Sequence, residues 1–362
     1  MGCLFSSSGG VGGVALSERA LAYKVTTQAA SRKPYSWEVA TDRPDPKDYM
    51  FMNKSNETLL RLPGSVNGQQ FVIENCKECD IFILDHTATV TIDDCVDCRI
   101  FLGPVESSVF IRDSTNCKCA FICRQFRTRT VKDSDFALLC ATRPVIEDSK
   151  ALRFACFDSS YAALEAQLKS AEISPFTNFW GFIHDFTPAD AMARPNHSFL
   201  PSPTAGTNDV LGTKELPAEV APLMKETHPR AVVTSNGERP LADAEHGALL
   251  VFPPSAESRA MDIVRDVFQN PSPSCSLVNT NRLAMDQQLA VEFVGALGKS
   301  CEGAKLTPKD FSAGGAKSKS VVLHFAGAGA FERLKGAAGA AGATISANVA
   351  AFAMVKHAGI DG

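Results

Sequence analysis

Hydrophobic and polar positions repeat with a period of about 19 residues between Phe71 and Arg129. One phase of the repeat contains Val72-Ile-Glu-Asn-Cys76, Val90-Thr-Ile-Asp-Asp-Cys95 and Val109-Phe-Ile-Arg-Asp-Ser114, and the next contains Cys79-Asp-Ile-Phe-Ile83 and Cys98-Arg-Ile-Phe-Leu102. A short period that joins strand-like residues to turn residues is typical of a solenoid. The pattern therefore predicts stacked coils, which would form a rigid, broad wall able to hold polar side chains against a docked partner.

The periodicity changes after the repeats. Tyr161, Leu164 and Leu168 stand at helical spacing, which predicts a helix over residues 161–169. An aromatic cluster follows, with Phe176, Phe179, Trp180, Phe182 and Phe186. Because the terminal coils of a solenoid need covering, we expect this cluster to cap its end or flank.

The rest of the chain divides by composition. Residues 189–245 are rich in Pro, Ala, Thr and charge with little periodicity, which predicts a linker. Beyond it, strand and helix patterns alternate, beginning with a strand over Ala248–Phe252 and a helix over Ala256–Phe268, so residues 246–362 are predicted to form a small α/β domain. Residues 1–34 are predicted to be a flexible tether, and residues 35–188 the first globular domain.

Composition and charge exclude several classes of protein. The net charge is −4 and the isoelectric point is near 6.0, so no strongly basic surface points to a nucleic-acid partner. The chain has no signal-peptide pattern and no apolar run of about 18 residues that could span a bilayer. We therefore expect a cytoplasmic protein whose 12 cysteines are reduced.

The N-terminus carries a lipidation pattern. Met1-Gly-Cys-Leu-Phe-Ser6 fits N-myristoylation at Gly2, and Cys3 beside it is a candidate for palmitoylation. One myristoyl chain binds a membrane only marginally, so a second acyl chain at Cys3 would give stable anchoring. A chance Met-Gly start is the alternative.

Two cysteine pairs allow two interpretations. Cys76-x-x-Cys79 and Cys95-x-x-Cys98 have the spacing of a zinc ribbon. They also recur in the phase of the repeat, so they could instead stack on neighbouring coils as small apolar thiols. We favour packing, and no metal site is predicted.

The segment Arg124-Gln-Phe-Arg-Thr-Arg129 carries the candidate chemistry. In a strand, Gln125, Arg127 and Arg129 would share one face and Phe126 the other. Glu147 lies about one coil further along, so its carboxylate could reach an arginine on the same wall and preorganise it. A structural ion pair on an exposed sheet would explain the same residues.

These residues belong to a longer set of motifs that resembles a known family. The matching stretches are Asp45-Pro-Lys-Asp-Tyr-Met-Phe51, Arg61-Leu-Pro-Gly64, Asp85-His-Thr-Ala-Thr-Val-Thr-Ile-Asp-Asp-Cys95, Phe101-Leu-Gly-Pro-Val105, Gln125-Phe-Arg-Thr-Arg129, Cys140-Ala-Thr-Arg-Pro-Val-Ile-Glu147 and Ile183-His-Asp-Phe-Thr-Pro188. Between about Tyr35 and Pro188 the chain resembles the retinitis pigmentosa 2 branch of the tubulin-folding cofactor C domain family. The resemblance implies a right-handed parallel β-helix, followed by a ferredoxin-like domain similar to nucleoside diphosphate kinases.

The resemblance also implies a function. It suggests a GTPase-activating protein for an Arf-like small GTPase in ciliary trafficking of lipidated cargo, with Arg127 as an arginine finger acting in trans. Glu147 and Arg129 would orient the finger, and Gln125 and Arg124 would contact the partner. Position 124 departs from the family, in which Gln is usual.

Other expectations follow from the same resemblance. The chain would have no cofactor and no turnover of its own, because GTP and Mg²⁺ belong to the GTPase. It would lie at the cytoplasmic face of the plasma membrane and at the ciliary base or cilium. A non-catalytic GTPase-binding scaffold or a module with a tubulin-related partner is the alternative. His324 stands in an apolar strand and Gly327-Ala-Gly329 is equally a tight turn, so no catalysis is predicted for the C-terminal domain.

Overall fold

The computed structural model describes residues 45–187, 194–202, 205–224, 234, 246–272, 274–298, 301–312 and 319–355. Gly2, Cys3 and the predicted tether lie outside these residues. Within the described residues, no helix has both the length and the apolar character needed to cross a membrane.

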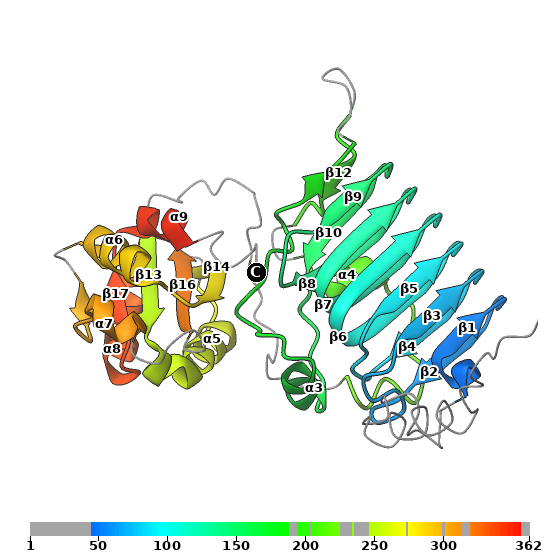
Figure 1. Ribbon diagram of the computed structural model, residues 1–362, viewed down its shortest axis with the longest axis horizontal. Helices are drawn as coiled ribbons and strands as arrows, with labels where there is room; N and C mark the ends of the chain where they lie inside the picture. The colour runs from blue at the N-terminus through cyan, green and yellow to red at the C-terminus, as the bar shows by residue number, and fades with distance from the viewer. Residues whose placement is uncertain are drawn as a thin grey trace, which may run out of the picture. The chain divides into compact units, whose positions relative to one another are not determined.

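The first part of the chain is a parallel β-helix (Figure 1), as the sequence predicted. Its elements are η1 (Pro46–Tyr49), β1 (Met50–Met52), β2 (Thr58–Arg61), β3 (Phe71–Glu74), β4 (Asp80–Ile83), β5 (Val90–Asp93), β6 (Arg99–Arg112), β7 (Lys118–Arg129), β8 (Asp135–Cys140), β9 (Val145–Glu147), β10 (Leu152–Cys156), α3 (Leu164–Ser170), β11 (His184–Asp185), β12 (His197–Phe199) and α4 (Thr207–Leu211). Phe71 pairs with Val90 and Val90 with Val109, so the period of the sequence is the length of one coil.

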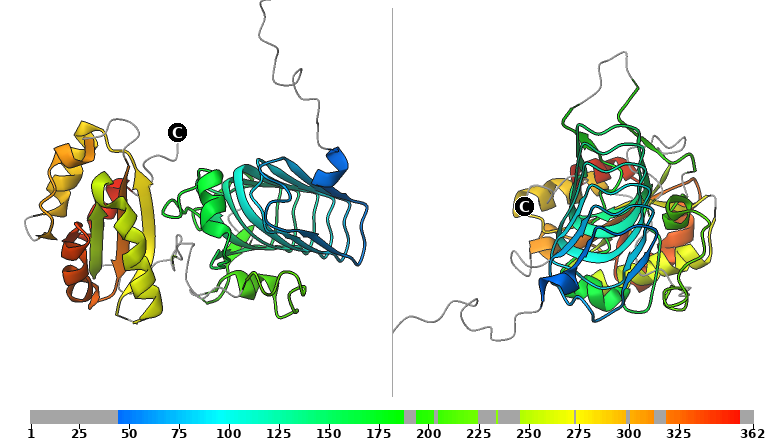
Figure 2. Two further views of the ribbon diagram at one scale, coloured as in Figure 1. Left: turned by 90° about the horizontal axis from the view of Figure 1, so that it is seen from below. Right: turned by 90° about the vertical axis from the view of Figure 1, so that its right-hand side faces the viewer.

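The coils have two long sides. Wall A consists of β1, β3, β5, the C-terminal halves of β6 and β7, β9 and β11. Wall B consists of β2, β4, the N-terminal halves of β6 and β7, β8, β10 and β12. The right-hand view of Figure 2 looks along the stack. Apolar side chains from both walls fill the interior.

Asn and Asp residues form the corner that follows wall A. Asn75, Asp94 and Asp113 stand at equivalent positions with φ of 51°, 51° and 48°. Short polar side chains tolerate this left-handed conformation better than other non-glycine residues do. The repeated Asn and Asp positions in the sequence are therefore the corners of the solenoid.

The outer face of wall B is covered. Phe82, Phe101 and Phe157 pack there against a second apolar layer that includes Leu164 and Leu168 of α3 and Val210 and Leu211 of α4. The outer face of wall A carries its charged side chains in the open. The two walls thus differ in their accessibility to a partner.

Part of the segment predicted as a linker packs on the β-helix. β12 pairs with β10, and α4 with Leu200 and Val220 belongs to the layer on wall B. Arg99, which is 6% exposed, donates to Asp80 at 2.9 Å and to the carbonyl of Lys214 at 2.7 Å, and the Lys214 ammonium pairs with Asp80. Residues 194–202 and 205–224 thus depart from the prediction of a plain linker; the domain boundaries remain predictions.

The C-terminal part has the predicted ferredoxin-like topology. Its elements are β13 (Gly247–Phe252), η2 (Pro254–Arg259), α5 (Ala260–Gln269), β14 (Ser276–Leu283), α6 (Gln287–Leu297), β15 (Glu302–Gly303), α7 (Pro308–Ser312), β16 (Ser320–Ala326), α8 (Ala330–Ala340), β17 (Thr344–Ser346), η4 (Val349–Ala351) and α9 (Phe352–Val355). The strand order is β14-β16-β13-β17-β15, with antiparallel neighbours. α5 and α8 pack on one face and α6, α7 and α9 on the other.

Candidate functional site: an arginine on the exposed wall

Arg127 lies on the open face of wall A. In β7, Phe126 and Thr128 are buried and point into the solenoid, whereas Arg127 and Arg129 are exposed. The alternation follows from the pleat of the strand, in which successive side chains point to opposite faces. The ring of Phe126 packs edge-on against that of Phe121, with 5.3 Å between the ring centroids, and its centroid lies 5.1 Å from that of Phe136. The backbone of Arg127 is therefore anchored to the core.

Arg127 belongs to a row of outward-facing side chains along wall A. Because the strands are parallel and in register, the members lie side by side at about 4.8 Å per coil. This Arg127 row consists of Met50, Val72, Thr91, Phe110, Arg127, Val145 and His184. The members other than Arg127 and His184 are half-buried and mostly apolar, so the guanidinium rises from an apolar strip.

A second row, two residues further along each strand, carries the charges. The Glu147 row consists of Glu74, Asp93, Arg112, Arg129 and Glu147. Asp93 binds Arg112 with two hydrogen bonds, of 2.8 and 2.5 Å. Glu147 lies directly beside Arg129, and in the part of the chain that the structure describes no ion pair within 4.0 Å joins it to Arg129 or Arg127. The strand, not a carboxylate, holds the two arginines.

Phe186 is a residue that the sequence reasoning misplaced. We expected it to help cap the solenoid, but its side chain is 61% exposed. Its amide donates to the Ile146 carbonyl at 2.9 Å, which places Phe186 beside Glu147 on wall A. The ring of His184 packs edge-on against that of Phe186, with 4.6 Å between the ring centroids. A large exposed aromatic side chain on the same wall as two exposed arginines is typical of a binding hot spot.

Arg124 and Gln125 occupy the bend that leads into this part of β7. The Gln125 side-chain oxygen accepts a hydrogen bond from Ser108 at 3.2 Å. The Arg124 guanidinium donates to backbone carbonyls, of which Glu106 is the nearest at 2.9 Å. Both side chains are half-buried, unlike the exposed Arg127.

The four cysteines of the ribbon-like pattern are core residues. Cys76, Cys79, Cys95 and Cys98 are at most 1% exposed and belong to the apolar interior. Cys98 lies 3.4 Å from the carbonyl of Cys76 in the preceding coil, and burial raises the pKa of Cys79, which favours its neutral thiol. Among the described residues, no cluster of three His, Cys, Asp or Glu side chains is arranged to hold a metal. The packing interpretation accounts for these cysteines.

The C-terminal candidates lie in packed surroundings. His324 is 9% exposed on β16, with its Nδ1 3.4 Å from the Asn279 amide and its ring 5.3 Å from that of Phe352. A Cβ on Gly327 would lie 2.2 Å from the Ser274 carbonyl, so this glycine allows close backbone packing. This packing explains Gly327 without a phosphate.

Comparison with known proteins finds relatives of the β-helix region. Residues 68–186 match the family Tubulin binding cofactor C. Protein XRP2 of Danio rerio is 50% identical over 204 residues, which cover 53% of this chain and 54% of the relative. Protein XRP2 of Homo sapiens is 48% identical over 222 residues, 61% of this chain and 62% of the relative. Tubulin-folding cofactor C of Arabidopsis thaliana is 39% identical over 77 residues, 21% of this chain and 22% of the relative.

The β-helix and these matches together indicate a cofactor C domain over residues 68–186, where the chain is similar to that family. Within it, the chain is similar to the XRP2 proteins, the retinitis pigmentosa 2 branch, as its motifs predicted. The chain spans between half and two thirds of the length of the XRP2 relatives described above. For this chain, the activity of the full-length relatives is therefore a proposal.

Proposed function

We propose that the β-helix is a GTPase-activating module for an Arf-like small GTPase and that Arg127 is its arginine finger. The observation that carries the proposal is the placement of Arg127: an exposed guanidinium on a rigid wall, flanked by an apolar row, with Phe186 exposed on the same wall. Wall B is covered by α3 and α4, which leaves wall A as the face for a partner.

The chemistry follows from the charge of the guanidinium. Negative charge develops on the phosphate oxygens as GTP is hydrolysed, and a cation delivered into a water-excluded interface stabilises it. Docking of the Arg127 row would exclude water around the guanidinium, because its neighbours Phe110 and Val145 are apolar. An arginine finger typically contributes a factor of about 10³ to 10⁵ in rate, or roughly 4 to 7 kcal/mol.

The neighbouring residues take supporting roles in this proposal. Glu147 and Arg129 would orient Arg127 once the partner is docked, since no ion pair fixes them in the described part of the free chain. Phe186 would supply apolar contact area. GTP and Mg²⁺ would be carried by the GTPase.

The proposal includes a location. Acylation at Gly2 and Cys3 would hold the protein at the cytoplasmic face of the plasma membrane, near the ciliary base, where it would act in traffic of lipidated cargo. The sequence pattern at the N-terminus supports this part.

A second candidate function is a scaffold that binds a GTPase or a tubulin-related partner without accelerating hydrolysis. The observation that favours it is the match to the cofactor C family, some of whose members are named for tubulin folding. Both candidates use wall A, so the role of Arg127 separates them.

A transition-state analogue distinguishes these candidates. A GTPase loaded with GDP and aluminium fluoride imitates the transition state, and a finger is recruited only to that form. We expect wild-type protein to bind the analogue complex tightly and Arg127→Ala to lose this binding while still binding the GTP-loaded GTPase. Arg153→Ala is the control, because Arg153 is an exposed arginine on wall B, where its guanidinium pairs with Asp135. Equal binding of both forms by wild type and Arg127→Ala would favour the scaffold.

A further inference from the structure

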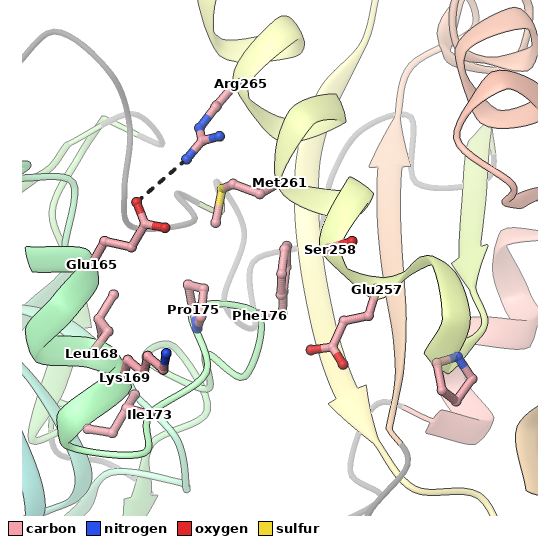
Figure 3. Close-up of a pocket in the computed structure, with 11 residues that line it drawn as sticks. Glu165, Leu168, Lys169, Ile173, Pro175, Phe176, Glu257, Ser258, Met261 and Arg265 are labelled. Atoms are coloured by element: carbon pink, nitrogen blue, oxygen red, sulfur yellow. Dashed lines mark ion pairs between the residues drawn. The ribbon is translucent and has the colours of Figure 1, made fainter. Parts of the chain in front are cut away.

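Arg124 connects two separate segments at the rim of wall A. Its Nε donates to the Glu106 carbonyl of β6 at 2.9 Å. Its Nη2 lies 3.5 Å from the Ala171 carbonyl and 3.4 Å from the Glu172 carbonyl, just past the end of α3. Lys169 and Ile173 mark this end of the helix and the following turn in Figure 3. A cation is favourable there because the carbonyls at a helix C-terminus carry partial negative charge.

The Glu106 carbonyl belongs to an irregularity in β6. Val105 pairs with Cys123 and Ser108 pairs with Gln125, so β6 has one extra residue opposite Arg124. Such a bulge bends the strand and shifts the register beyond it, and a slip of one residue would turn each following side chain to the other face. Arg124 and Gln125 both hold this bulge through their side chains.

The register beyond the bulge decides where Arg127 points. Ordered pairing resumes at Ser108 and Gln125, and two residues later Phe110 pairs with Arg127. The next coil holds the backbone of Arg124 from the other side. The Arg124 carbonyl accepts hydrogen bonds from the amide and from the hydroxyl of Thr142, each at 3.0 Å. Arg124 is thus held between three consecutive coils, three residues before Arg127.

We propose that Arg124 is a positioning residue for Arg127 and not a contact to the partner. This inference rests on the proposed function for its effect on GTP hydrolysis. The hydrogen bonds of the Arg124 guanidinium to the carbonyls of Glu106, Ala171 and Glu172, here called the brace, are a property of the free chain. Glutamine, usual at this position in the family, has two donors on one nitrogen, whereas the guanidinium fork reaches carbonyls of two segments at once.

The kinetic test separates positioning from contact. Single-turnover GTP hydrolysis by an Arf-like GTPase is measured over a range of concentrations of wild-type, Arg124→Gln and Arg124→Lys protein. A positioning role predicts that Arg124→Gln lowers the saturating rate about tenfold, with the half-saturating concentration unchanged and Arg124→Lys in between. A raised half-saturating concentration at an unchanged saturating rate would show a partner contact and overturn the proposal, as would two unchanged parameters.

A second measurement does not depend on any GTPase. Amide hydrogen exchange of the full chain is expected to quicken in Arg124→Gln at residues 106–108, 126–129 and 171–173, while Arg153→Gln leaves these amides unchanged. Unchanged exchange in Arg124→Gln overturns the brace even if wild type activates a GTPase. Faster exchange at these amides, with no acceleration by wild type, refutes the proposed function and retains the brace. If Arg124→Gln does not fold, Arg124→Lys decides both measurements.

Discussion

Arg127 takes its position from the backbone of β7. Phe126 buries its ring among Phe121 and Phe136, and this fixes Arg127 on the opposite face. A rigid base under an exposed charged end suits a residue that inserts into a partner. Phe186 completes the surface as an exposed aromatic side chain.

Phe186→Ala tests the hot spot. We expect the half-saturating concentration for GTPase activation to rise at least tenfold, about 1.4 kcal/mol of binding, because buried aromatic anchors dominate interfaces. The saturating rate and the melting temperature should not change, since the ring is 61% exposed in the free chain. Val96→Ala, an exposed apolar residue outside the two rows, is the control. An unchanged half-saturating concentration would remove Phe186 from the interface.

Among the elements, an ion group of buried Asp80, buried Arg99 and exposed Lys214 holds residues 205–224 on wall B. Burial acts to raise the pKa of Asp80, but the hydrogen bonds and charges of Arg99 and Lys214 together outweigh it and lower the pKa below 3.8. Because the folded pKa is depressed, the stability from this group is fully present above the unfolded pKa. It is lost as pH falls through the folded value.

Asp80→Asn tests this group. At pH 7 we expect the variant to lose about 3 kcal/mol of unfolding free energy, because Arg99 is left buried without its carboxylate. The difference from wild type should shrink as pH falls below 3.8. Urea unfolding at several pH values measures both effects. A difference that is constant with pH would contradict the pairing.

The cysteines give a second test at this scale. Because their thiols fill the solenoid interior, we expect the purified protein to contain far less than one zinc per chain and to melt at the same temperature with and without a chelator. Elemental analysis and thermal unfolding measure these quantities. One bound zinc per chain, with a lower melting temperature after chelation, would restore the zinc-ribbon interpretation.

The sequence predicted those features of the fold that depend on local period. The 19-residue repeat predicted the coils, and the alternation around Phe126 predicted the exposed face of Arg127. Phe186 could not be placed, because its position depends on the pairing of β11 with β9, 39 residues earlier, outside the repeat. The segment around α4 also has no period, and its packing depends on the distant residues Arg99 and Asp80.

In the chain as a whole, the exposed wall A and the predicted membrane anchor would act together. The anchor would concentrate the β-helix where a membrane-bound GTPase is found, which raises the effective concentration of both. Gly2 and Cys3 lie outside the described residues, so this part depends on the N-terminal sequence pattern.

Two N-terminal variants test the anchor. Gly2→Ala should release the protein from membranes, because it removes the site for the first acyl chain. Cys3→Ser should leave weak, reversible binding, because one myristoyl chain binds only marginally. Membrane fractionation of cells that express each variant measures the bound share. Unchanged binding of Gly2→Ala would exclude acylation as the means of attachment.

In the proposed function, Arg127 accelerates GTP hydrolysis by a partner. Single-turnover hydrolysis by a panel of Arf-like GTPases, with wild-type protein and with Arg127→Ala, tests it directly. We predict that wild type accelerates at least one GTPase by about 10³-fold or more, and that Arg127→Ala abolishes this effect while it still binds the GTP-loaded partner. Acceleration that survives in Arg127→Ala, or binding without acceleration across the panel, would contradict the claim.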